Sequence, residues 1–247
     1  MSKIKINLVT VGHLPADFDK SKIKLWKSDV FSIVGDIENY SLVNDSDGEG
    51  WSYTDDNLAQ QLPHEVSGDF LIALVNVPLQ FNWYSRRLND NKIIFTFHEM
   101  REILQFSNIP LENIVLRLLY AYSLQFKRSN GKLPTSSEYT NFTHDETRGC
   151  LFDMNGIKTD VVHSCHQPIV CSDCVGRLRN ETVSDNLISK VQQEIKKVQK
   201  PLFYRALDFV KIHPVWSLSI SAASAIVLGA IGSYLATIIY VALNGQV

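Results

Sequence analysis

The sequence has few cysteines and almost no net charge. The first argues against a disulfide-bonded secreted domain, and the second argues against a nucleic-acid-binding protein. Four cysteines among 247 residues are too few for a small secreted domain held together by disulfides. A net charge of -2 leaves no surplus of positive charge for the phosphates of a nucleic acid. With 12 glycines, the chain is not collagen-like either. We therefore expect a folded protein with one sizeable core and no nucleic acid partner.

Charge is missing altogether from the carboxy-terminal segment. The last charged residue is Lys211, and residues 216–243 are apolar or small and polar. As a helix with a rise of about 1.5 Å per residue, this segment would be about 42 Å long, which is enough to cross a hydrocarbon core of about 30 Å once but not twice. Trp216 and Tyr240 lie where aromatic side chains can meet the two membrane surfaces. We predict a single transmembrane helix that binds a lipid bilayer.

The distribution of basic residues orients this helix. Six basic and two acidic residues lie between Lys190 and Lys211, whereas residues 244–247 carry no charge. Basic residues flanking a membrane helix remain on the cytoplasmic side. The amino terminus lacks the apolar run of a secretory signal. We predict a single-pass protein of the cell inner membrane with a cytoplasmic amino-terminal domain, whose cysteines lie in a reducing compartment.

Small residues recur along one side of the apolar segment. Ser217, Ser221, Ala225 and Gly229 are spaced by four positions, which allows two helices to approach closely. The pattern predicts a homo-oligomer formed through the membrane helix. Small residues are also common in membrane helices that do not pair, and this alternative stays open.

The amino-terminal part predicts an α+β fold. Alternating or unbroken apolar runs indicate strands of one sheet at residues 4–11, 31–34, 70–77 and 93–97. Helical spacing of apolar residues indicates helices at residues 99–105 and 111–126, the second packed under the sheet. We expect a mixed sheet with packed helices over residues 1–180.

The segment after Ser184 predicts another helix. The apolar residues of this helix follow at steps of four and three, close to a coiled-coil pattern, at Leu187, Val191, Ile195, Val198 and Leu202. Pro201 should kink the helix. We interpret residues 181–213 as a helical stalk that joins the domain to the membrane helix at residues 214–243. Packing of this helix on the sheet is the alternative.

Cysteines and histidines are clustered in one short window. All four cysteines and three of the seven histidines lie between His144 and Cys174. Cys171-Ser-Asp-Cys174 has the Cys-x2-Cys spacing that allows two thiolates to bind one tetrahedral zinc ion. In a cytosolic protein this pattern favours a metal over a disulfide. A pair of small buried thiols with accidental spacing is the alternative.

We predict a structural Zn²⁺ site formed by Cys150, Cys171, Cys174 and a fourth ligand. His144 is the first choice for the fourth ligand and Cys165 is the alternative. Four protein ligands would close the site, whereas three ligands and a water could be catalytic. Outside this window, Tyr84, Arg86 and Arg87 could bind an acidic ligand or form a surface patch.

This window resembles the carboxy-terminal part of archaemetzincin-type zincin-like proteins. Three parts carry the resemblance: Cys150-Leu-Phe-Asp-Met154, Asp160 and Cys171-Ser-Asp-Cys174-Val-Gly-Arg-Leu178. In that family a cysteine, an apolar pair and a methionine precede an aspartate and a Cys-x2-Cys-x3-Leu motif, and the cysteines hold a structural zinc. The resemblance implies a zincin-like domain with a zinc knuckle.

The catalytic motif of that family, His-Glu-x-x-His, is absent. His64-Glu65 is followed by Gly68, and His98-Glu99 is followed by Glu102 where the second histidine should stand. The resemblance therefore implies a zincin-like shell without its protease site, and we assign no catalytic residues.

The expected function combines these parts. We predict a membrane-anchored sensor or effector, non-enzymatic, whose zinc-stabilised domain responds to an unknown protein or small molecule and controls a self-associating span. This plan resembles that of membrane-disrupting effectors in bacterial antiviral defence and toxin systems. A membrane-tethered metallo-hydrolase and a passive membrane adaptor are the alternatives.

Overall fold

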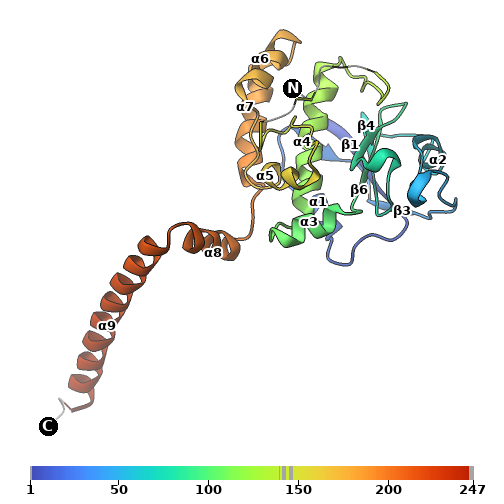
Figure 1. Cartoon of the computed structure of the whole chain (residues 1–247). Coiled ribbons are helices and arrows are strands. Elements are labelled where there is room, and N and C mark those ends of the chain that lie inside the picture. The colour runs from blue at the N-terminus through green and yellow to red at the C-terminus, as the bar shows by residue number, and fades with distance from the viewer. Residues whose placement is uncertain (1, 139, 141–142, 145–146, 245–247) are drawn as a thin grey trace. The chain divides into compact units, whose positions relative to one another are not determined.

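The computed structural model describes residues 2–138, 140, 143–144 and 147–244 (Figure 1). The chain divides into two compact units, Met1–Gln199 and Lys200–Val247. We refer to them as unit 1 and unit 2 and describe each by itself.

A mixed sheet forms the centre of unit 1. In the described part of the chain, six strands pair in the order β2-β1-β4-β6-β5, and β3 pairs with β1 beyond the end of β2. All neighbours are parallel except β5, which is antiparallel to β6 at the edge. The strands are β1 (Ile4–Val11), β2 (Phe31–Ile33), β3 (Glu38–Tyr40), β4 (Phe70–Val75), β5 (Ser85–Arg87) and β6 (Lys92–Thr96).

The central strands are apolar throughout because both faces of the sheet are covered. All six residues of β4 are buried, as expected for a parallel strand between two layers. Phe70, Ile72 and Leu74 point into the larger core, and Leu71, Ala73 and Val75 point into the smaller core on the other face. This alternation follows from the two-residue period of a strand.

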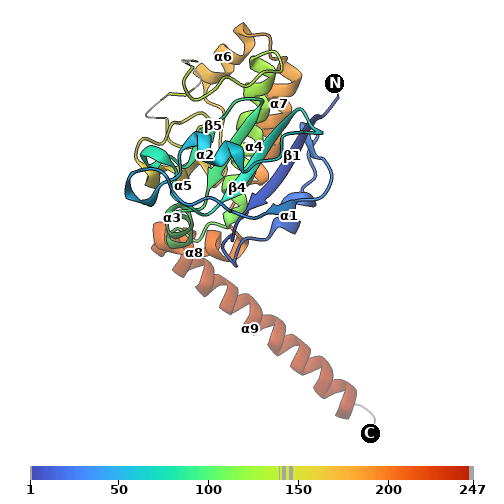
Figure 2. The ribbon, with the colours of Figure 1, turned by 90° about the vertical axis from the view of Figure 1, so that its right-hand side faces the viewer.

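Helices cover the two faces unequally (Figures 1 and 2). Helix α4 (Leu111–Arg128) and helix α7 (Asp185–Glu194) lie on one face, and α2 (Asp55–Gln60) lies on the other. The other helices of unit 1 are α1 (Lys20–Lys24), α3 (Met100–Phe106), α5 (Val161–Ser164), α6 (Ser172–Asn180) and the short 3-10 helices η1 (Glu49–Trp51), η2 (Gln80–Asn82), η3 (Lys158–Asp160) and η4 (Ile195–Lys197). The predicted α+β fold with a mixed sheet is confirmed.

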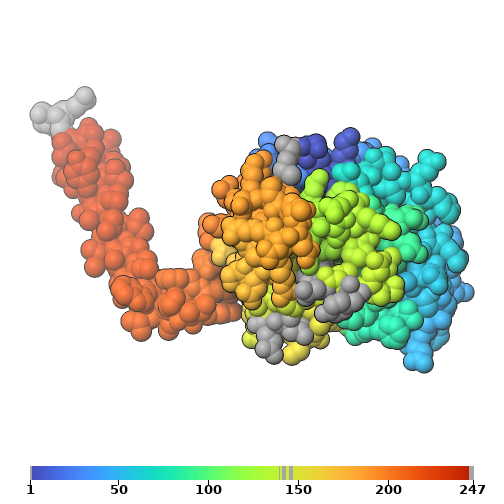
Figure 3. Space-filling model, turned by 90° about the horizontal axis from the view of Figure 1, so that it is seen from above, coloured from blue at the N-terminus to red at the C-terminus, as the bar shows by residue number. Residues whose placement is uncertain are grey.

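The segment predicted as the start of a stalk belongs to unit 1. Leu187, Val191, Ile195 and Val198 are all buried in the larger core. Leu202, the last residue of the predicted row, instead lies in unit 2 and is exposed. In the space-filling view, the orange surface of α6 and α7 continues into the yellow-green surface at the end of α4 (Figure 3). A row of apolar residues at steps of four and three can face a sheet as well as a second helix, and here it faces the core.

Glu194 fixes this helix to α4 and to the segment that leads into β2. It is 8% exposed. Its carboxylate accepts hydrogen bonds from Ser28 Oγ at 2.5 Å, from the backbone N–H of Asp29 at 2.7 Å and from the Tyr120 hydroxyl at 2.7 Å. These three bonds join α7, the segment before β2 and α4. Unit 1 therefore extends to Gln199, beyond the boundary expected at residue 180.

Unit 2 consists of two helices, α8 (Leu202–Ile212) and α9 (Pro214–Asn244). Pro201 caps α8, so the expected kink is a complete break between helices. Helix α9 has 31 residues, none of them charged. In the described part of the chain it is the one helix long and apolar enough to cross a membrane.

Candidate metal centre

The Cys-x2-Cys knuckle opens helix α6. Cys171 is the N-cap residue, with φ of -66° and ψ of 165°, and its Sγ accepts a hydrogen bond from the backbone N–H of Cys174 at 3.5 Å. Because a capping side chain turns back over the first helical turn, both thiols of the knuckle point to the same side. The local sequence thus positions two of the four thiol and imidazole groups, those of Cys171 and Cys174, independently of the rest of the fold.

Cys150 is brought to the knuckle by a short backbone pairing. The N–H of Leu151 donates to the carbonyl of Ile169 at 2.8 Å, and the N–H of Ile169 donates to the carbonyl of Gly149 at 2.8 Å. This pairing places Cys150 beside the start of α6. Gly149 has a φ of +91°, a backbone conformation that side chains rarely adopt, so the turn before Cys150 favours glycine.

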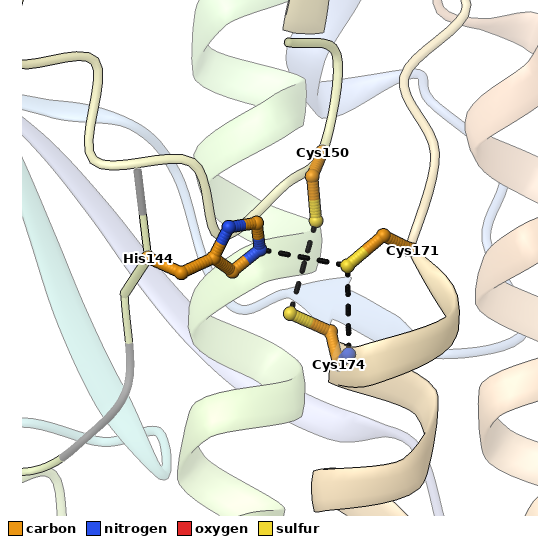
Figure 4. Close-up of side chains that lie close together, drawn as sticks. All are labelled: His144, Cys150, Cys171 and Cys174. Atoms are coloured by element: carbon orange, nitrogen blue, oxygen red, sulfur yellow. Dashed lines mark hydrogen bonds between the residues drawn. The ribbon is translucent and has the colours of Figure 1, made fainter. Parts of the chain in front are cut away.

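His144 is held by a second backbone pairing. Its N–H donates to the carbonyl of Phe152 at 3.1 Å, and its carbonyl accepts from the N–H of Met154 at 3.0 Å. Its Nε2 lies 3.5 Å from the Sγ of Cys171. Figure 4 shows the imidazole and the three thiols pointing toward a common centre.

The distances in this cluster fit one tetrahedral ion. The ligand atoms of His144, Cys150, Cys171 and Cys174 all lie within 4.8 Å of one another. The Sγ atoms of Cys150 and Cys174 are 3.9 Å apart. Sulfurs bound to one zinc at about 2.3 Å in tetrahedral geometry are about 3.8 Å apart. The structure therefore contains a His/Cys3 group that could bind zinc, as the sequence predicted.

The protonation of the thiols also suits a cation. The hydrogen bond shared with Cys174 lowers the pKa of Cys150 below its ordinary value, and the same bond raises the pKa of Cys174. Cys150 is fully buried, and this hydrogen bond favours its thiolate form. Thiolate and imidazole donors suit zinc, and four protein ligands leave no open coordination position.

Cys165, the alternative fourth ligand, lies outside this group. It is fully buried, and burial raises its pKa to about 12, so it remains a neutral thiol. Its backbone carbonyl accepts a hydrogen bond from Asn113 Nδ2 of α4 at 2.8 Å. Asn113 thereby anchors the end of α5 to α4.

Sequence reasoning overlooked Arg117, the largest fully buried side chain in the described residues. It stands in α4 outside the predicted apolar stripe of Leu111, Ile114, Val115, Leu118, Leu119 and Tyr122, so the helical spacing does not predict its burial. The sequence alone does not mark this arginine as buried, because the partners of its guanidinium, Ser164 and Asp153, are brought to it by the fold.

Comparison with known proteins gives one distant likeness. No known family matches the sequence, and no curated protein matches it. The crystal structure of archaemetzincin from Methanopyrus kandleri is similar, with a TM-score of 0.44 and 13% sequence identity over 72% of this chain and 95% of that chain. Archaemetzincins are the family that the segment from Cys150 to Leu178 resembles.

Proposed function

We propose that this chain is a membrane-anchored sensor or effector whose zinc-stabilised domain faces the cytoplasm. Helix α9 carries the proposal: all of its 31 residues are uncharged, and such a helix is most stable in a bilayer. The basic residues before it, such as Lys196, Lys197 and Lys200, favour a cytoplasmic position for unit 1.

The zinc in this proposal stabilises the fold and takes no part in a reaction. When bound, it would join the loop that carries Cys150 to the first turn of α6, and four protein ligands would leave no position for a water. Helix α4 contains no histidine. X-ray absorption on the purified protein should show three sulfurs and one nitrogen at the metal. A water-derived oxygen in place of the nitrogen would support the alternative of a metallo-hydrolase.

Helix α8 is suited to the surface of the same membrane. Arg205, Asp208 and Lys211 recur every three residues and share one side of the helix, while apolar side chains such as Phe203 and Leu207 occupy the other. An amphipathic helix with basic residues on its polar side lies well in the interface of an anionic bilayer. We therefore place α8 along the cytoplasmic surface, next to the start of α9.

The span is the output of the proposed sensor or effector. The small residues Ser217, Ser221, Ala225 and Gly229 allow two copies of α9 to pack closely, so a signal received by unit 1 would change the association of spans and disturb the bilayer. Induced expression with a potential-sensitive dye measures this. Collapse of the membrane potential is expected, and unchanged growth and potential under every trigger tried would contradict the effector role.

Carbonate extraction tests the anchor itself. The full chain should stay in the membrane pellet, and a variant that ends at residue 213 should be released, because carbonate strips proteins bound only at the surface. Ile226→Arg places a charge at the middle of the span and should weaken its insertion, whereas Ile226→Leu is the matched control. Release of the full chain by carbonate would refute the anchor.

A further inference from the structure

Lysines gather at one edge of the sheet of unit 1, beside strand β2. A hollow of about 600 Å³ extends from the end of α1 past β2 to η4, and a smaller hollow shares Asp29 with it. Among the described residues, no arginine lines either hollow. The lining lysines are Lys3, Lys24, Lys27 and Lys197 in the first hollow, and Lys127 and Lys190 in the second. We call these six residues the lysine surface.

The lysine surface keeps a surplus of positive charge. The described carboxylates that line it or pair with it are those of Asp29, Asp36 and Glu194. Glu194 is buried and already accepts the three hydrogen bonds that fix α7. Asp29 lies 3.7 Å from Lys3, and Asp36 pairs with Lys24. Both aspartates are largely exposed, so these ion pairs contribute little and can exchange for another anion.

Another hollow of unit 1 carries the opposite charge. It lies around η1 and η2 and is lined by Asp47, Glu49 and Glu99, and no lysine or arginine of the described residues lines it. Charge is therefore distributed unevenly over unit 1, although the whole chain is nearly neutral. A domain with such a distribution is oriented by the field of a charged surface.

An apolar side chain lies among these lysines. Leu25 follows α1, lines the larger hollow and is 76% exposed. The next residue, Trp26, donates from its Nε1 to the Tyr120 hydroxyl at 2.9 Å, which fixes this segment to α4 while Leu25 stays exposed. Basic side chains next to an exposed apolar one are the combination that binds the interface of an anionic bilayer.

A short stretch of chain joins the lysine surface to the membrane helix. Lys197 lies in η4, and unit 1 ends two residues later at Gln199. Five residue steps separate Lys197 from Leu202 at the start of α8, and they span at most about 18 Å when fully extended. If α8 lies along the cytoplasmic surface, as proposed above, Lys197 is held close to the lipid headgroups.

We propose that the lysine surface docks on anionic lipid headgroups of the membrane in which α9 is anchored. The proposal rests on the proposed function for the anchor and adds a partner for unit 1. Lysine suits this partner, because its ammonium attracts headgroups as a point charge, without the fixed geometry of an arginine fork. Each lysine near such a surface strengthens binding about fivefold, so weak contacts suffice for a tethered domain. The opposing explanation is a solvated surface that contacts no lipid.

Lysine labelling of the full chain in lipid nanodiscs tests this docking. One preparation contains phosphatidylcholine alone, and the other contains equal amounts of phosphatidylcholine and phosphatidylglycerol. Mass spectrometry measures how fast an uncharged amine-reactive reagent labels each lysine. Lys24, Lys27 and Lys197 should be labelled at least about threefold more slowly in the anionic discs. Lys132, which lines neither hollow, should be labelled equally in both. Equal labelling of the lysine surface in both kinds of disc would overturn the proposal.

Salt and a charge reversal identify the cause of the protection. Raising sodium chloride from about 0.1 M to about 1 M shortens the Debye length from about 10 Å to about 3 Å and should abolish the protection. Lys27→Glu should return the labelling of Lys197 at least halfway to its rate in neutral discs. Lys132→Glu, the matched control with the same change of charge, should not. Protection that persists in high salt, or in Lys27→Glu, would refute docking by charge.

A nucleic acid is the other kind of partner that lysines attract. If a single-stranded oligonucleotide protects the same lysines and anionic discs do not, the lysine surface binds nucleic acid and the proposal is wrong. Only chains that copurify with discs are compared, so a loss of protection leaves the anchor of α9 intact. Carbonate extraction tests that anchor, and the docking and the anchor can therefore fail separately.

Discussion

Alanine substitution of each cysteine distinguishes metal ligands from a buried thiol. Cys174→Ala removes one of four converging ligand atoms, and the remaining three should bind zinc much more weakly. Structural zinc contributes an apparent 10–16 kcal/mol in small zinc-binding peptides, whereas a whole domain is stable by only about 5–15 kcal/mol. Even a fraction of that contribution would be a large share of the stability of unit 1. We expect zinc to fall from about one ion per chain to near zero, and Tm to fall by more than about 10 °C.

Cys165→Ala is the matched control for this experiment. Its sulfur is fully buried but lies outside the group of ligand atoms, so its removal leaves only a small cavity. Such a cavity destabilises a core by roughly 1–2 kcal/mol, or about 2–8 °C in Tm for a domain of this size. Zinc content should stay near one ion per chain, measured by elemental analysis after dialysis. Loss of zinc from Cys165→Ala, with zinc retained by Cys174→Ala, would refute the ligand set.

Three further predictions follow from contacts outside the ligand set. Glu194→Ala leaves three donors without their acceptor and should lower the free energy of unfolding by roughly 3–5 kcal/mol, measured by urea titration. Glu194→Gln should lower it less. An unchanged urea midpoint for Glu194→Ala would mean that this carboxylate does not fix α7. Gly149→Ala places a side chain at a φ of +91° and should lower the free energy of unfolding by about 1–3 kcal/mol. It should also weaken zinc binding, because this turn positions Cys150. Normal zinc affinity of the variant would contradict this role of the turn. Burial raises the pKa of Tyr122 above its ordinary 10.0. The contribution of neutral Tyr122 to the free energy of unfolding is therefore complete below pH 10 and is lost as the pH rises further. Tyr122→Phe should reduce this loss of stability at high pH, and an identical pH dependence of both proteins would exclude a role of Tyr122 in it.

The larger elements could be predicted because their signals are local. The alternation in residues 4–11 and the apolar run at 70–77 identify β1 and β4, and helical spacing identifies α4. The edge strands β3 and β5 could not be found in this way. Each has three residues, none fully buried, and each becomes a strand only because a longer neighbour offers free backbone groups.

Part of the candidate metal site could be predicted from the sequence because its signal is also local. The knuckle is local, since Cys171 caps the helix that carries Cys174. The sequence ranks His144 above Cys165 as the fourth ligand but does not decide between them, because the position of each depends on contacts distant in sequence. His144 is placed by its pairing with the segment around Asp153, and Cys165 is placed by Asn113 of α4.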